Sequence, residues 1–224
     1  MRIKIGARTR KSILADPLAT EEEIRELPGK DAMTHPNCPP DLWWRMAAIR
    51  PIEAMKSPAY DLMMLESPER WVEIEKERVL SWVENFTKDL SAKDARLFAA
   101  DCAEHVLPAW VFVDRTDKRP QAAIAAARAY AEGKSSKAKL AKAYEDAKEA
   151  SLAQNSRQAY YNPQNTFHVE CRRAYSAAVA AYLAAGLVSN LTLSVQHAVR
   201  AVPQIRDEGL WQWHRLVGYL MARP

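Results

Sequence analysis

Cysteine and histidine occur together in two places where helical spacing would bring their side chains onto one face. Cys102 and His105 are three residues apart, and so are His168 and Cys171. Side chains at positions i and i+3 of a helix point the same way, so two such helices could present two sulfurs and two imidazoles to a tetrahedral zinc ion. Alanine-rich helices also commonly bury cysteine as a small hydrophobic residue. The spacing therefore leaves open both a zinc site and a protein without a cofactor.

The same two cysteines are the candidate nucleophiles, with His105, His168 or His197 as a base and Asp101 or Glu170 as an orienting acid. Neither cysteine has a nucleophile-elbow or oxyanion sequence beside it. The chain also contains no phosphate-binding loop and no dinucleotide-binding fingerprint. We therefore predict no catalytic residues and no enzymatic activity.

Large aromatic residues supply a second kind of candidate site, because tryptophan and tyrosine beside arginine are typical of protein interfaces. Trp43 and Trp44 are adjacent and Trp211 and Trp213 nearly so, which means that one ring of each pair should point away from the core. Two adjacent tyrosines lie in an irregular stretch, residues 155–166. Partial burial under a neighbouring helix is the alternative for the tryptophans. The predicted partner-binding residues are Trp44, Tyr160, Tyr161 and Trp213.

Composition limits the class of protein and its partners. Of the 224 residues, 48% are hydrophobic and 27% charged, which is ordinary for a globular protein, and only six are glycine, which argues against a glycine-rich nucleotide-binding fold. The net charge of +4 permits nucleic-acid contact but does not favour it. Three cysteines without a close pair predict no disulfide framework and a reducing cytoplasm. No apolar run is long enough for a signal peptide or a membrane span.

The elements that would position these residues are predicted to be helices throughout. Apolar residues recur every three or four positions over Lys93–Gly133, which indicates two helices with alanine faces packed closely at the centre of the fold, the first bending or ending near Pro108. Prolines crowd the first 70 residues and predict short helices there. We predict an all-α protein, a multi-helix bundle or an orthogonal helical array with short solenoid-like helices at the N-terminus. Residues 1–66 would pack on a helical domain formed by residues 67–224.

Two segments resemble known families. The phrases RLFAADCAEHVLPAW and DKRPQAAIAAARAYAEG are similar to the helical domain of predicted immunity proteins from bacterial polymorphic toxin systems, over about residues 91–200, although His105 stands where that pattern has arginine. HPNCPPDLWWRMA, residues 35–47, resembles the opening phrase of a leucine-rich-repeat variant, with a degenerate copy at residues 16–27. The matching positions of the immunity pattern are Arg96, Phe98, Ala99, Cys102, Ala103, Val106, Leu107, Pro108, Arg119, Pro120, Ala123, Ile124, Ala126, Ala127 and Arg128.

The first resemblance implies a non-enzymatic, protein-binding inhibitor in the bacterial cytoplasm that occludes one toxin or effector. Arg96 and Arg128 would then either meet an acidic toxin surface or bridge to Asp101 or Asp117 within the helix pair, and we favour the second role. Two alternatives stay open. A nucleic-acid-associated adaptor would use the basic N-terminal arm and the lysines at 134–142, and a metal-dependent enzyme would use the Cys/His pairs.

Overall fold

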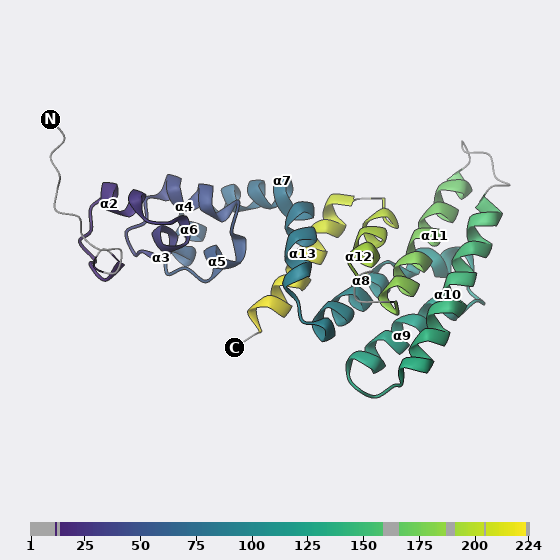
Figure 1. The fold of residues 1–224 in the computed structure, drawn as a ribbon. Coiled ribbons are helices and arrows are strands. Elements are labelled where there is room, and N and C mark those ends of the chain that lie inside the picture. Colours follow the sequence, from purple (N-terminus) through teal and green to yellow (C-terminus); the bar gives the residue numbers. More distant parts are fainter. Residues whose placement is uncertain (1–11, 13, 159–165, 187–190, 204, 223–224) are drawn as a thin grey trace. The chain divides into compact units, whose positions relative to one another are not determined.

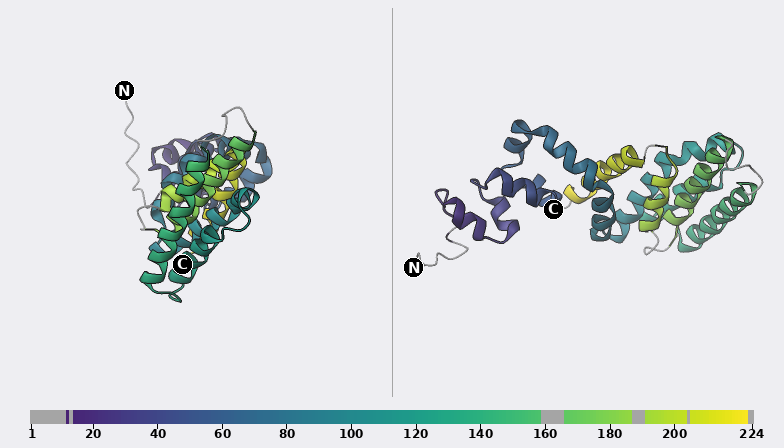
Figure 2. Two further views of the ribbon diagram at one scale, coloured as in Figure 1. Left: turned by 90° about the vertical axis from the view of Figure 1, so that its right-hand side faces the viewer. Right: turned by 90° about the horizontal axis from the view of Figure 1, so that it is seen from above.

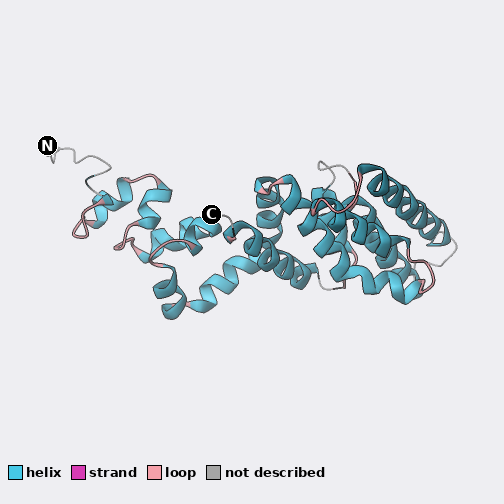
Figure 3. Cartoon of the chain, turned by 90° about the horizontal axis from the view of Figure 1, so that it is seen from below, coloured by secondary structure: helices cyan, strands magenta, loops and turns pink. Residues whose placement is uncertain are grey.

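In the computed structural model, helices account for nearly all regular structure. The described residues are 12, 14–158, 166–186, 191–203 and 205–222, and within these ranges the cartoon contains helices and loops and no strand (Figure 3). The all-α prediction is confirmed. The chain forms two compact units, Met1–Arg78 and Val79–Pro224, with the division inside helix α7 (Pro68–Phe86). The boundary after residue 66 that the sequence suggested stays a prediction.

The first unit is built from short helices that begin and end at proline and polar caps. Thr20 forms a capping box with Glu23, and the next helices start at or beside prolines, whose fixed φ suits a first turn. Besides the first part of α7, its helices are α2 (Glu21–Glu26), α3 (Gly29–Thr34), α4 (Pro40–Ala47), α5 (Pro51–Met55) and α6 (Tyr60–Glu66).

The His-Pro-Asn phrase of this unit ties its two repeat-like segments together. The buried His35 ring bonds through Nε2 to the carbonyl of Asp16 at 3.0 Å and accepts from the backbone N–H of Asn37 through Nδ1. The side chain of Asn37 donates to the carbonyl of Pro17. The side chain of Asn37 thus holds the preceding segment, and α4 begins after Pro39 without a side-chain cap.

The second unit consists of longer helices with alanine at their contacts. It comprises the end of α7, the 3-10 turn η1 (Thr87–Asp89), α8 (Ala92–Val113), α9 (Arg119–Ala131), α10 (Lys137–Gln158), α11 (Thr166–Ala184), α12 (Leu191–Arg200) and α13 (Ile205–Met221). Helix α11 lies between α10 and α12 and packs most extensively on α8 (Figures 1 and 2). Helix α9 packs on α8, α10 and α11, and α13 on α8 and α12.

Alanine explains why these helices approach so closely. Small side chains let helix axes come together, and fully buried alanines lie on α8, α9 and α11. The predicted pair of α8 and α9 is present, but the centre of the unit is the contact of α8 with α11, which the spacing of residues 93–133 alone did not reveal. The alanines on these three helices without exposed surface are Ala99, Ala100, Ala103, Ala123, Ala127, Ala174, Ala177, Ala178, Ala180, Ala181 and Ala184.

The C-terminal end of α9 matches a local rule of helix termination, and α8 departs from another. Gly133 follows α9 with φ +73°, and the N–H groups of Gly133 and Lys134 bond to the carbonyls of Tyr130 and Ala129, which is a Schellman ending. Helix α8 begins after its cap, Ser91, and runs through Pro108 to Val113. Of the two outcomes predicted at Pro108, a bend or an end, the end is therefore wrong. The proline lies on the exposed side of the helix, where the carbonyl that it cannot pair can be hydrated.

Candidate functional site

A buried carboxylate on α8 joins three helices. Asp101, with 9% of its side chain exposed, accepts hydrogen bonds from Nη2 of Arg128 on α9 at 2.8 Å and from Nε of Arg215 on α13 at 2.6 Å. Its second oxygen also accepts from the hydroxyl of Tyr219 at 2.7 Å. Burial, together with this bond to a carboxylate, raises the pKa of Tyr219 above its ordinary range. We call these four residues the Asp101 hub, which fixes α9 and α13 against α8.

Arg128 has the structural role that was predicted for it. Arg96 bonds to a residue other than the predicted Asp101 or Asp117. Arg128 bridges to Asp101 and also pairs with Glu104. Arg96 donates from Nη2 to the carbonyl of Gly186 at 2.7 Å, and its guanidinium lies 5.1 Å from the ring centroid of Tyr130. Burial lowers the pKa of Arg96, because desolvation penalises the charged form. Both arginines are thus used inside the unit.

One turn further along α8, His105 packs against α13. Its ring stacks on Trp211 with centroids 3.8 Å apart and planes 2° from parallel, and Nδ1 lies 2.8 Å from a carboxylate oxygen of Glu208. Burial raises the pKa of Glu208, while its contact with His105 acts in the opposite direction. Below this pair, burial raises the pKa of the Cys102 thiol well above its usual value. An inert thiol and an engaged imidazole do not form an activated nucleophile.

The side of α8 that faces away from its buried alanines carries an apolar stripe, which is exposed among the described residues of the unit. Six residues at i, i+3, i+4, i+7, i+8 and i+11 line an open depression, and Phe112 is 63% exposed. Among the described residues of this unit, Phe112 is the most exposed large apolar side chain. We call this surface the α8 stripe, and its residues are Glu104, Leu107, Pro108, Val111, Phe112 and Arg115.

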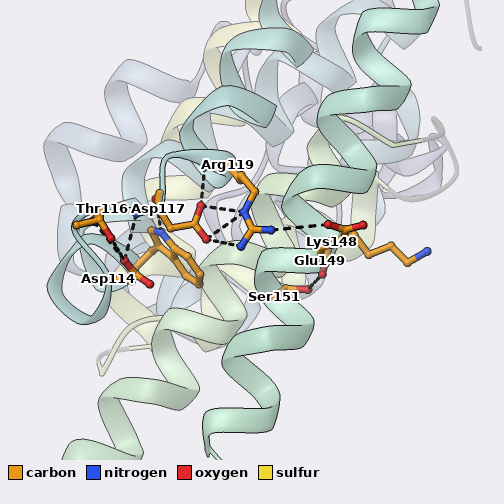
Figure 4. A network of polar contacts seen from close by, with 8 residues as sticks. Asp114, Thr116, Asp117, Arg119, Lys148, Glu149 and Ser151 are labelled. Carbon is orange, nitrogen blue, oxygen red and sulfur yellow. Dashed lines mark hydrogen bonds and ion pairs between the residues drawn. The ribbon is translucent and has the colours of Figure 1, made fainter.

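The stripe ends at a tightly bonded connection, residues 114–118, between α8 and α9 (Figure 4). Oδ1 of Asp114 accepts from the backbone N–H groups of Thr116 and Asp117, and the indole N–H of Trp110 donates to the carbonyl of Asp117 at 2.9 Å. Arg119 bonds to the carboxylate of Asp117 and lies 3.8 Å from Glu149 on α10. Arg119 lowers the pKa of Asp117. The connection therefore holds a fixed shape at the end of the stripe.

The four predicted zinc ligands are only partly described. Cys102 on α8 and Cys171 on α11 are both buried, and these two helices pack together. His105 instead turns to Glu208 and Trp211 on α13, and the side chain of His168 lies outside the described part of the chain. Within that part, no group of three or more histidine, cysteine, aspartate or glutamate side chains is arranged to hold a metal ion. A protein without a cofactor and the alternative of a zinc site both stay untested predictions.

The predicted partner-binding tryptophans are buried, so they are not surface residues. Trp44 is 3% exposed, stacked edge-on against Trp43 and covered by Arg70, while Trp213 is fully buried against Trp82 and Phe86. In the second pair the half-buried ring is Trp211, the opposite of the prediction. Both Trp43 and Trp44 point inward because the short helices of the first unit surround α4. Tyr160 and Tyr161 lie outside the described residues.

Sequence comparison places this helical unit among known proteins. A family model described as Imm-5 like putative immunity protein matches residues 85–201, just over half of the chain. The chain belongs to this family. Comparisons with curated proteins and with solved structures found no match. In this Imm-5 like protein the matched segment contains helices α8 to α12, and thus the Asp101 carboxylate, Arg128 and the whole α8 stripe.

Helix α13 and the first unit lie outside the matched segment in this Imm-5 like protein. The α13 residues that contact His105 and Asp101 on α8, namely Glu208, Trp211, Arg215 and Tyr219, follow the matched region. Sequence reasoning noticed Asp101 as a bridge for arginine but missed the α8 stripe, because it expected the helix to bend or end at Pro108. The signal was present, since Leu107, Val111 and Phe112 continue the helical spacing past that proline. No helix in the described ranges is long and apolar enough to cross a membrane.

Proposed function

We propose that this Imm-5 like protein is an immunity protein that neutralises a bacterial toxin by binding it and blocking access to it, without catalysing a reaction. The observation that carries the proposal is the family match over residues 85–201, which covers most of a compact helical unit. The geometry supports binding over catalysis, because the titratable groups of α8 are used in internal contacts, as the pairs of Asp101 with Arg215 and of His105 with Glu208 illustrate.

The proposal also places the protein in the cytoplasm, where an immunity protein meets a toxin that enters or is made in the same cell. All three cysteines, Cys38, Cys102 and Cys171, are free and buried, which suits a reducing compartment. Among the described residues of the second unit, the α8 stripe is an uncovered apolar surface, and proteins commonly bind each other through such surfaces.

The test begins with a tagged pull-down from native cytoplasm at about 0.3 M salt, which screens weak contacts with phosphate, followed by mass spectrometry. The protein encoded beside this chain is then expressed in a sensitive host with and without it. We expect a stoichiometric complex and restored growth. A helical protein of the same size and net charge serves as the control. If the neighbouring protein is toxic, and neither binds this chain nor loses toxicity in its presence, the proposed function is wrong.

A further inference from the structure

We infer that the α8 stripe is the surface on which the toxin docks, and that the docking face of the toxin has an apolar centre rimmed by carboxylates. This inference rests on the proposed function and assigns the chemistry of its partner. It starts from the fact that α8 carries apolar side chains on two different faces. One face is buried against α9, α11 and α12, and the other carries large apolar side chains in water.

The apolar centre of the stripe has the composition of an interface core. Phe112 and Pro108 are exposed, and Leu107 and Val111 are half-buried beside them. Other exposed apolar side chains of this unit, such as Leu152 on α10 and Leu193 on α12, do not share a depression with it. Single exposed apolar residues are ordinary, whereas a contiguous set along two turns of one helix indicates a binding surface.

The charge around the stripe points to an acidic partner. Arg115 lines the depression and Lys118 follows in the same connection, and both are exposed and without an ion pair among the described residues. Two neighbouring carboxylates already have ion-pair partners, because Asp117 pairs with Arg119 and Glu104 pairs with Arg128. Asp114 accepts from the backbone N–H groups of Thr116 and Asp117, and with its charge counted, residues 114–119 carry a net charge of +1, of which Arg115 and Lys118 are the exposed cations. Carboxylates around an apolar centre would complement this pattern.

The stripe is also held in place before any partner arrives. The hydrogen bonds of Asp114 and Trp110 fix the connection from which Arg115 and Lys118 project, and Arg119 links that connection to α10 (Figure 4). A surface that is ordered beforehand loses less conformational entropy on binding. The buried alanine contacts behind α8 add to this rigidity, since they leave the helix little room to shift.

A second copy of the chain is a weaker match than an acidic partner. In a two-fold contact each residue meets the same surface of the other copy, so Arg115 would need a carboxylate on the stripe itself. The one carboxylate there, Glu104, is paired with Arg128. Self-association would thus bury the cations without new ion pairs.

The experiment measures binding of the purified toxic protein encoded beside this chain to the full-length chain and to variants, by calorimetry and by association kinetics. Phe112→Asp and Phe112→Ala remove the apolar centre, and Arg115→Glu with Lys118→Glu reverses the rim charge. Leu152→Asp is the matched control, because Leu152 is exposed to a similar degree, 54% against 63%, on another helix of the unit. Urea unfolding of each variant confirms that it is folded.

We expect Phe112→Asp to weaken binding by about 30-fold or more, as at other interface hot spots, and Phe112→Ala to weaken it in the same direction. The charge reversal should slow association roughly tenfold at low salt, with a smaller effect at about 0.5 M salt. Leu152→Asp should bind as the wild type does.

Binding that survives both Phe112 substitutions would overturn the inference while leaving the proposed function intact. The inference would also be overturned if the charge-reversal variant lost binding while both Phe112 variants kept it, because the contact would then be electrostatic without an apolar centre. A dimer of this chain in sedimentation experiments that Phe112→Asp dissociates would assign the stripe to self-association instead. If the wild-type chain binds no neighbouring toxin, the proposed function and this inference both fail.

Discussion

Replacing Asp101 by asparagine tests whether the Asp101 hub holds the second unit together. The substitution keeps the size of the side chain but removes the negative charge that Arg128, Arg215 and Tyr219 share. It also places an amide N–H where one of these donors now points. One or two of the three donors must then lose a good acceptor in a site where the carboxyl side chain is only 9% exposed.

The size of the effect follows from how buried each partner is. A hydrogen bond to a charged group contributes roughly 1.5–3 kcal/mol, and breaking a fully buried ion pair by removing one partner costs about 3–5 kcal/mol. Here the side chains of Arg128 and Arg215 are 35% and 53% exposed, so water replaces part of what they lose. We therefore expect Asp101→Asn to lower the free energy of unfolding by about 2–3 kcal/mol.

Urea unfolding monitored by tryptophan fluorescence measures this change. Two control variants separate the contributions. Tyr219→Phe removes one donor and should cost about 1 kcal/mol, whereas Glu104→Gln removes an exposed carboxylate and should cost no more than about 0.5 kcal/mol. The pKa of Tyr219 should also fall towards its ordinary value in Asp101→Asn. An unfolding free energy for Asp101→Asn within about 0.5 kcal/mol of the wild type would refute the reasoning, because the hub would then be no stronger than a surface ion pair.

Three further results should follow from the structure. Burial and the charge of Arg200 lower the pKa of His197, so the folded protein binds this proton less tightly than the unfolded chain. Stability is then complete above the unfolded pKa of about 6.5 and falls as the pH drops through the folded pKa, and His197→Gln should lose less unfolding free energy than the wild type between about pH 7 and pH 5. The three buried thiols should resist a thiol reagent in the native protein and all react in urea; fast native labelling would show that the cores open readily. Gly133→Ala should lower stability by about 1 kcal/mol in the same urea assay, because φ there is +73° although no atom lies within 4 Å of an added Cβ, and an unchanged midpoint would contradict this.

Local chemistry in the sequence was enough to predict much of the helical framework. The capping box at Thr20, the cap at Ser91 and the helix ending at Gly133 depend on neighbouring residues, and all three are present. The bond between Arg128 and Asp101 also followed, because opposite charges on paired helices have few other partners.

Features that depend on distant contacts were harder to predict. Whether Trp211 or Trp213 faces outward is decided by Trp82 and Phe86 at the end of α7, which no spacing within α13 reveals. Proline in a helix usually ends it, and the continuation through Pro108 depends on that residue lying at the water-exposed side. The α8 stripe was not predicted, because the helix was expected to bend or end at Pro108.

The two faces of α8 have unequal freedom to change during evolution. Ala99, Ala100 and Ala103 have no exposed surface, so a larger residue at any of them would push neighbouring helices apart. Phe112 on the same helix, and Arg115 in the connection that follows it, can be replaced without moving a buried atom. A lineage could therefore alter which toxin it resists through substitutions on the outer face, one residue at a time, while the inner face keeps the protein folded at every step.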